Sequence, residues 1–412
     1  MNYLTKSKFK LATECPAKLF YTDKSEYINN KIDNPFLEAL ADGGYQVGEL
    51  AKYYYPNGHH VYALDYDEAL EQTNKLLEQD EVTIYEAAVK HNNLFIRVDI
   101  LIKRGLFIKI IEVKAKSIDN KLKSFLTKKE DKVLAKWEPY LFDVAFQRYV
   151  ARSAFPDLTV TSYLLLTDKT ATTPTEGLNQ KFQITVDDKK RKGVSVSSSL
   201  SEEDLSVKLM RQIPVDVECD LICNTKVGND RRGVNFIGQI KEYSKSYSND
   251  IKIRPILKKE CRDCEFHASQ KDLDSGFRSG FHECWKEQLN WTDKDFEKPN
   301  VLDIWDCREK DKLIQDGKIK FSQFYEEDIN PSFEVGDGKL CRKERQWLQI
   351  EKVRSNDTSA WIDKSGLKAE MDSWVYPLHF IDFETTAMAI PFNKGRRPYE
   401  GIAFQFSHHV VY

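Results

Sequence analysis

No apolar run in this chain approaches the roughly 20 residues that a helix needs to cross a membrane. The first ten residues, MNYLTKSKFK, also lack the apolar stretch and cleavage pattern of a secretory signal peptide. We therefore expect a cytoplasmic protein with no membrane partner. Cysteines stay reduced in the cytoplasm, so clustered cysteines there indicate metal binding rather than disulfides.

The chain also has little net charge. Its 62 Lys and Arg against 65 Asp and Glu leave a net charge of −3, which excludes a general polyanion-binding protein. The charge is uneven, because the stretch from Lys103 to Lys136 holds eleven Lys or Arg and four Asp or Glu. Such a basic stretch is typical of a segment that binds the phosphate backbone of a nucleic acid, although a solvated lysine-rich helix has the same composition. The 412 residues suffice for two or three domains.

The segment Phe95–Ser117, FIRVDILIKRGLFIKIIEVKAKS, predicts two strands joined by a tight turn. Gly105-Leu106 suits a two-residue turn with Gly at its first central position. This turn pairs Arg104 with Phe107 and thereby fixes the register of the two strands.

Counting back from the turn places Asp99 opposite Glu112. Side chains directly opposite each other lie roughly 4.5–5.5 Å apart at Cβ, and like charges there are destabilising. A bound divalent cation would offset the repulsion between the two carboxylates. Lys114 lies two residues beyond Glu112, so it points to the same face of the hairpin.

An Asp followed by Glu-x-Lys at the end of an apolar strand resembles the core of the PD-(D/E)XK nucleases. The resemblance implies that Asp99 and Glu112 hold Mg²⁺ or Mn²⁺, and that Lys114 orients the attacking water or stabilises the developing charge. For Glu-x-Lys by itself, the alternative is a solvated hairpin face with a chance charge pair.

Other residues extend this candidate site. Glu49 falls off the apolar stripe of a predicted helix at 36–55, where some related nucleases place a third carboxylate; an exposed Glu is the alternative. Glu86 interrupts an otherwise apolar predicted strand, and we expect it to face the site. Gln147, in FQRYV, resembles the DNA-contacting Gln of RecB-type domains, with a buried helix Gln as the alternative. The Tyr that the family places four residues later is absent here, and the nearest is Tyr149.

Further helices are predicted at 67–79 and 139–155, and strands at 83–89, 158–167 and 181–186. Residues 187–200 are polar and predict a loop. Ser201 and Asp204 resemble a capping box that opens a helix to about Arg211. Strands flanked by helices predict an α/β core, which the nuclease resemblance makes a mixed central sheet of the restriction-endonuclease type.

The cysteines suggest a second metal centre. Cys261 and Cys264 form a C-x2-C pair, and Cys284 follows, a pattern that suits tetrahedral Zn²⁺ or a 4Fe–4S cluster. One group of PD-(D/E)XK nucleases, including the AddB-type helicase-nucleases, carries one Cys before the nuclease core and three after it. That resemblance implies a 4Fe–4S cluster held by Cys15, Cys261, Cys264 and Cys284.

The remaining cysteines leave alternatives open. Cys219 and Cys223 form a looser pair that could join Cys261 and Cys264 in a zinc site. For Cys307 and Cys341 we expect free buried thiols.

Near the C-terminal end, HFIDFETT predicts a strand that presents Asp382 and Glu384 on one face. Asp-x-Glu on an apolar strand resembles the opening motif of DEDD exonucleases of the RNase H-like fold, where the pair binds metal ions. We expect this domain to be incomplete, with no exonuclease activity of its own, and the chain to be a fragment of a longer protein.

Taken together, the motifs resemble a bacterial family of unknown function with an N-terminal RecB-like nuclease domain and a C-terminal RNase H-like domain. The resemblance implies a nuclease domain at 1–290, a helical linker region at 291–375 and the first RNase H-like strands at 376–412. The predicted activity is metal-dependent hydrolysis of DNA, acting as an exonuclease on single strands or duplex ends. The alternative is a non-catalytic nucleic-acid-binding scaffold with a structural zinc.

Overall fold

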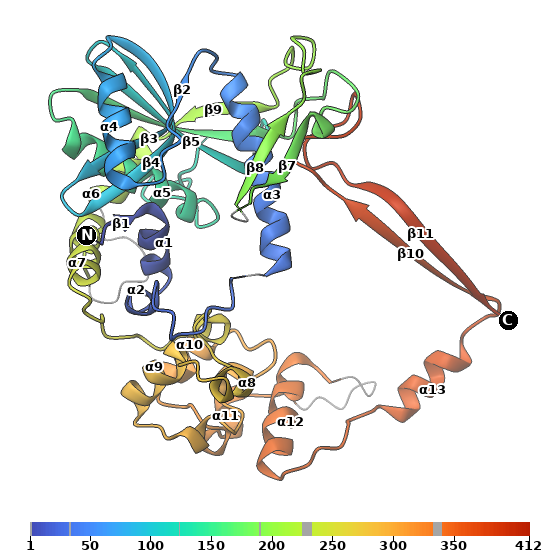
Figure 1. The fold of residues 1–412 in the computed structure, drawn as a ribbon. Helices are drawn as coiled ribbons and strands as arrows, with labels where there is room; N and C mark the ends of the chain where they lie inside the picture. Colours follow the sequence, from blue (N-terminus) through green and yellow to red (C-terminus); the bar gives the residue numbers. More distant parts are fainter. Residues whose placement is uncertain (1, 33, 123, 189–190, 225–232, 333–339) are drawn as a thin grey trace. The chain divides into compact units, whose positions relative to one another are not determined.

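The computed structural model describes residues 2–32, 34–122, 124–188, 191–224, 233–332 and 340–412, which form two compact units (Figure 1). The first unit comprises residues 1–20, 33–253 and 384–405, and the second comprises 21–32, 254–383 and 406–412. The domain boundaries expected after residues 290 and 375 divide the chain differently and remain predictions.

A seven-stranded mixed sheet organises the first unit, in the order β2-β3-β4-β5-β6-β9 with β1 beside β4. β3, β4 and β5 are successively antiparallel, β5 and β6 are parallel, and β9 is antiparallel to β6. Helices flank this sheet, so the predicted α/β class is confirmed. The strands are β1 (Leu4–Thr5), β2 (His59–His60), β3 (Glu81–His91), β4 (Leu94–Arg104), β5 (Phe107–Ile118), β6 (Thr159–Asp168) and β9 (Met210–Pro214).

The turn between β4 and β5 has the predicted form. Gly105 adopts a φ of 53°, which a glycine reaches without steric cost. Arg104 pairs with Phe107, and the predicted register continues to the pair Ile100 and Ile111. The chemistry of the turn therefore sets the pairing of the two strands that carry the predicted carboxylates.

The sheet has a hydrophobic core on each face. Leu101 and Ile110 belong to the core that includes α5, whereas Ile100 and Ile111 belong to the core that includes α3. Apolar residues on both faces explain why these strands are nearly continuous hydrophobic runs. The helices of this unit include α1 (Lys6–Glu14), α3 (Pro35–Tyr53), α4 (Tyr66–Leu77), α5 (Glu138–Ala154), α6 (Asp216–Asn224) and α7 (Phe236–Ser248), and the short α2 (Lys18–Tyr21) spans the unit boundary.

Two predictions after β6 are wrong. Residues 187–200, of which 189–190 lie outside the described residues, contribute β8 (Lys192–Val196), which pairs with β7 (Phe182–Val186). The Ser201–Asp204 hydrogen bonds form, but a turn and β9 follow instead of a helix. Asp204 is buried and paired with Lys181 at 2.5 Å, so tertiary contacts use its side chain.

The second unit is built from short helices around its own core, which includes Trp285, Phe324 and Ile350. No helix in the described part of the chain is both long and apolar enough to span a membrane. The helices are α8 (Gln270–Asp274), α9 (Gly280–Leu289), α10 (Lys310–Gln315), α11 (Glu326–Ile329), α12 (Arg342–Arg354) and α13 (Lys364–Asp372).

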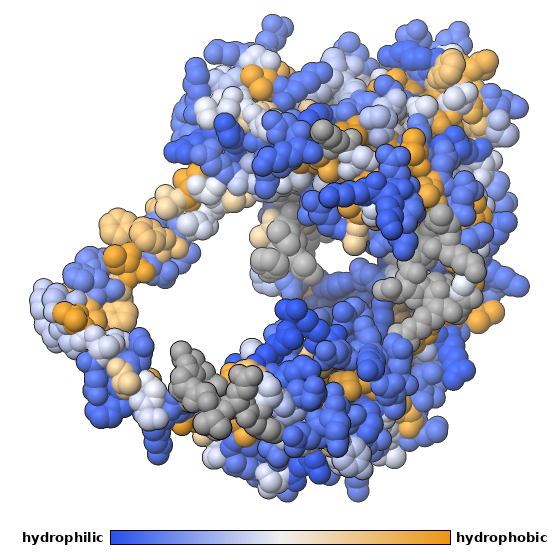
Figure 2. All heavy atoms as spheres, turned by 180° about the vertical axis from the view of Figure 1, so that it is seen from behind, coloured by the Kyte–Doolittle hydropathy of each residue, from blue (hydrophilic) through white to orange (hydrophobic). Residues whose placement is uncertain are grey.

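The two strands predicted near the C-terminal end are present as β10 (Leu378–Thr386) and β11 (Ile402–Val411), which pair with each other in a two-stranded sheet. Apolar side chains are exposed along this hairpin (Figure 2), among them Phe380, Phe383, Phe404 and Phe406.

Candidate active site

The candidate site lies where β4 changes its neighbour. The second half of β4 pairs with β5 as far as Ile100 and Ile111, whereas its first two residues pair with β1. Asp99 lies at the resulting fork, and its Oδ2 accepts a hydrogen bond from the backbone N–H of Val113 at 2.7 Å. The Asp99 carboxylate thus accepts a backbone hydrogen bond at the point where the regular pairing of β4 with β5 ends.

Glu112, the next residue of β5 after Ile111, is the centre of the site. Its side chain is 2% exposed, and its Oε1 accepts Lys114 Nζ at 2.7 Å and Lys6 Nζ at 2.6 Å. Gln147 Nε2 donates to the other oxygen, Oε2, at 2.5 Å. Of the residues singled out from the sequence, the structure therefore brings Glu112, Lys114 and Gln147 into direct contact.

Lys6 also links the two carboxylates, because its ammonium lies 3.9 Å from Asp99 Oδ1. It is the first residue of α1, which follows β1 directly and has Thr5 as its N-cap. Sequence reasoning missed Lys6, since no local pattern points to a partner 106 positions away.

Asp143 is the second residue that sequence reasoning missed. Its Oδ2 lies 3.1 Å from Lys114 Nζ, and its side chain is almost fully buried. Asp143 precedes Gln147 by four residues on α5, so both project from the same side of the helix toward β5. This i, i+4 spacing on a predicted helix is the signal that could have identified it.

The two carboxyl groups titrate in opposite directions. Burial, together with the neighbouring Glu112, raises the pKa of Asp99 to about 7. Burial would also raise the pKa of Glu112, but the ammonium groups of Lys6 and Lys114 hold it well below its usual range. Near neutral pH, Glu112 is therefore ionised while Asp99 exchanges its proton. Divergent pKa values in adjacent acids are typical of functional sites.

Glu86, on β3, supplies a third carboxylate next to Asp99 in the sheet. The register of β3 and β4 places Glu86 opposite Asp99, just as that of β4 and β5 places Glu112 on the other side. Glu86 has a φ of 55°, an uncommon conformation for a residue inside a strand. Burial raises its pKa, and the charge of Glu112 adds to the shift. The expectation that Glu86 faces the site is therefore consistent with its position.

Glu49 and Tyr149 lie in other surroundings. Glu49, on α3, pairs with Lys52 at 2.6 Å. Tyr149, on α5, packs against the hydrophobic core of the first unit. The Glu49 side chain is half-buried, and its role as a third metal ligand stays a prediction.

Among the described residues, no group of three or more His, Cys, Asp and Glu side chains is arranged to hold a metal ion. Mg²⁺ commonly uses only one or two protein carboxylates and completes its coordination with water and phosphate oxygens. Asp99 and Glu112 offer oxygen donors of this kind, and the Lys6 ammonium beside both shows that the position favours a cation. These residues therefore fit a hard divalent cation such as Mg²⁺ or Mn²⁺.

The cysteines predicted to bind a cluster belong to both units. Cys261 lies in a 3₁₀ turn (Lys259–Asp263), Cys264 follows it, and Cys284 lies on α9, where its Sγ is 3.3 Å from the hydroxyl of Tyr21. All three pack against the core of the second unit, whereas Cys15 caps the end of α1 in the first unit. A cluster held by these four residues remains a prediction.

The other cysteines have structural surroundings. Cys219 is buried in the core of the first unit and accepts a hydrogen bond from Ser162 Oγ, and Cys223 packs against the same core. Both therefore behave as core residues, which weighs against the alternative zinc site. Cys307 is buried, as expected. Cys341 is exposed, contrary to expectation, because it serves as the N-cap of α12.

β10 carries Asp382 and Glu384, and both side chains are exposed on this two-stranded hairpin. Residues 379–412 match a family described as Domain of unknown function (DUF2779). The DUF2779 match covers most of β10, all of β11 and the segment between them. No curated protein and no solved structure matches the chain.

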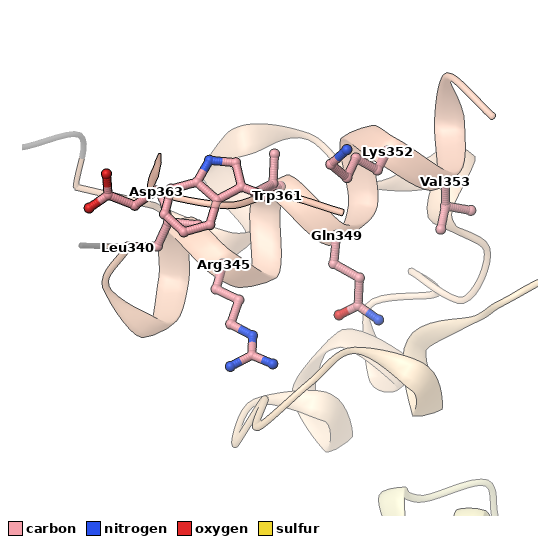
Figure 3. A pocket seen from close by; sticks show the side chains of 8 residues that line it. Leu340, Arg345, Gln349, Lys352, Val353, Trp361 and Asp363 are labelled. Carbon is pink, nitrogen blue, oxygen red and sulfur yellow. The ribbon is translucent and has the colours of Figure 1, made fainter. Parts of the chain in front are cut away.

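A pocket of about 780 Å³ lies in the second unit, against α12 (Figure 3). Its lining includes Arg345, Gln349, Lys352 and Trp361, with Asp363 as its acidic residue. One carboxylate among basic and apolar side chains does not form an acid pair for a metal ion. We therefore place the candidate chemistry at the fork between β4 and β5.

Proposed function

We propose that this protein is a metal-dependent nuclease of the PD-(D/E)XK type that hydrolyses phosphodiester bonds in DNA. The observation that carries the proposal is the convergence of Asp99, Glu112, Lys114 and Gln147 at one fork of a mixed sheet, since hydrolysis of this kind needs carboxylates and a lysine together. A bound Mg²⁺ or Mn²⁺ would activate the attacking water and neutralise charge on the scissile phosphate.

The protein's own residues prepare this site. Asp99 and Glu112 would hold the cation, and the Gln147 amide keeps one oxygen of Glu112 in place. Asp143 and Glu112 together fix the Lys114 ammonium, which can then hold the water or steady the charge that develops on the phosphate. Lys6 balances the two carboxylates when no metal ion is bound.

Groups that suit a nucleic acid lie next to the site. Lys116, two residues beyond Lys114, is exposed, and its ammonium lies 5.7 Å from the ring centre of Tyr140 and 5.9 Å from that of Trp137. An exposed lysine beside the site can contact a phosphate of a nucleic-acid backbone, whereas Trp137 is buried in the core of the first unit. Lys116 therefore supports a nucleic-acid substrate, and we propose single strands or duplex ends of DNA and an exonuclease mode.

We further propose that Cys15, Cys261, Cys264 and Cys284 hold a 4Fe–4S cluster, with Zn²⁺ as the alternative metal. The spacing of the cysteines along the chain supports this, as does the packing of three of them against one core. The exposed DUF2779 pair, Asp382 and Glu384, is proposed to have no activity of its own in this chain.

The nuclease proposal is tested with end-labelled single- and double-stranded DNA and RNA in Mg²⁺ or Mn²⁺. We expect the wild type to degrade DNA and Glu112→Gln to lose this activity, whereas Glu81→Gln, at an exposed Glu that pairs with Arg104, keeps it. Binding of DNA without cleavage in either metal would contradict the proposal and favour the non-catalytic scaffold.

A further inference from the structure

The segment between β10 and β11, residues 387–401, packs onto the first unit. Thr173 and Arg396 are joined through the Thr173 N–H and the Arg396 carbonyl at 2.9 Å, and Gly395 N–H donates to the Thr173 carbonyl at 2.8 Å. Asn179 Nδ2 donates to the Ile390 carbonyl at 2.9 Å, and Ile390 is 1% exposed. Part of the DUF2779 stretch is thus built into the unit that carries the candidate site.

This segment meets β5 at an irregularity just beyond Lys114. Lys114 pairs with Leu166 on β6, but the next pair is Ser117 with Thr167, so Ala115 and Lys116 lack a regular partner there. Such bulges occur beside active sites, where they redirect a side chain. The carbonyl of Ala115 accepts a hydrogen bond from the hydroxyl of Tyr399.

Tyr399 is well placed to fix this bulge. Its ring packs, half-buried, against the core that includes α3, and burial with Tyr140 nearby raises its pKa to about 12. The hydroxyl therefore remains a neutral donor throughout the physiological range. Tyr140 precedes Asp143 and Gln147 on α5, so Tyr399 is a neighbour of the helix that holds Lys114 in place.

We propose that Tyr399 is a positioning residue for Lys114, an inference that rests on the proposed nuclease function for its effect on cleavage. By holding the Ala115 carbonyl, the Tyr399 hydroxyl fixes the backbone at the residue after Lys114. The Lys114 ammonium is then directed at Glu112 and Asp143. Segment 387–401 thereby supports the nuclease site without adding a group that touches the metal ion or the phosphate.

Tyr399→Phe removes only the hydroxyl and is the variant of choice. Tyr55→Phe is the matched control, because it removes a hydroxyl that bonds Gln212 Oε1 in the same unit. We expect Tyr399→Phe to lower kcat for DNA cleavage roughly tenfold to a hundredfold with KM unchanged, since small misplacements of catalytic groups have effects of this size. Tyr55→Phe should retain wild-type kcat.

A second measurement does not depend on cleavage. Brief acetylation with acetic anhydride, followed by mass spectrometry, reports how well each lysine is protected by its partners. In Tyr399→Phe we expect labelling of Lys114 to rise at least threefold, while Lys109 on the same strand is unchanged and Tyr55→Phe resembles the wild type.

Unchanged labelling of Lys114 in Tyr399→Phe would overturn the inference, even if kcat fell. Increased labelling in a protein that cleaves no nucleic acid would support the positioning role and reject the nuclease proposal alone.

Discussion

Lys6 places a positive charge where we propose that a metal ion binds. Its ammonium lies 2.6 Å from Glu112 and 3.9 Å from Asp99, on the two carboxylates that would hold the cation. An ion that binds there must displace or redirect this positive charge. We therefore expect the positive charge of Lys6 to weaken the binding of a metal ion.

We predict that Lys6→Met binds Mn²⁺ about tenfold more tightly than the wild type, equivalent to about 1.4 kcal/mol. The physical reason is that the variant leaves Glu112 and Asp99 without a competing ammonium. Isothermal titration calorimetry measures the affinity, and Lys18→Met, which removes an i, i+4 partner of Glu14, is the control. Weaker binding of Mn²⁺ to Lys6→Met would contradict this role.

Asp99 makes the site sensitive to pH. Its pKa is raised to about 7 from an ordinary value of 3.8, so the folded protein binds a proton that the unfolded chain releases. Stability in the absence of metal ions should therefore fall as the pH rises from about 4 to about 7, because folding then requires an ionised, poorly solvated carboxylate.

Asp99→Asn should accordingly stabilise the metal-free protein at pH 8 by about 1–3 kcal/mol, with a smaller gain at pH 5. Urea unfolding in EDTA at both pH values measures the difference, with Glu81→Gln as the control. If the Asn variant is no more stable than the wild type at pH 8, the ionised Asp99 carboxylate does not destabilise the metal-free protein, which would contradict this prediction.

The residues predicted from sequence are those whose neighbours are set locally. The Gly105 turn fixes the register, so the positions of Asp99, Glu112 and Lys114 follow from counting along two strands. Lys6 and Asp143 were not predicted, because their contacts depend on how α1 and α5 pack onto the sheet. Glu49 pairs with Lys52 on its own helix, and the place at the site that the resemblance gives it stays a prediction.

At the scale of elements, periodicity predicted α3, α4 and α5 well because each has an apolar face that the sheet covers. Residues 201–211 were predicted as helix because Ser201 and Asp204 form a local cap. Two tertiary interactions override that local signal: the Asp204 carboxylate pairs with Lys181, and Met210–Pro214 pairs with β6 as strand β9. Local pattern is weakest where an open sheet edge competes for the same residues.

β10 provides a prediction at this scale. Asp382→Ala combined with Glu384→Ala should leave metal-dependent cleavage unchanged, because both carboxylates are exposed on a two-stranded hairpin. Glu112→Gln, in contrast, should abolish it. Cleavage that persists in Glu112→Gln and disappears when the two Ala substitutions are added would assign activity to the DUF2779 stretch.

At the scale of the whole molecule, the proposed cluster would draw its ligands from both units. Protein purified without oxygen should contain about four iron atoms per chain, as expected for a 4Fe–4S cluster. Cys15→Ser should lose most of this iron, whereas Cys341→Ser, at an exposed helix cap, should retain it. Iron analysis with a parallel zinc determination decides the matter, because a colourless protein with stoichiometric zinc would favour the structural-zinc alternative.

The proposed nuclease function requires Asp99 and Glu112 to share one divalent cation. A crystal of the protein grown with Mn²⁺ and a short oligonucleotide, measured at a wavelength where manganese scatters anomalously, tests it most directly. We expect an anomalous peak bounded by the Asp99 and Glu112 carboxylates, with the Lys6 ammonium moved away from both. A site without manganese, in which Lys6 still contacts Glu112 in the presence of excess Mn²⁺, would contradict it.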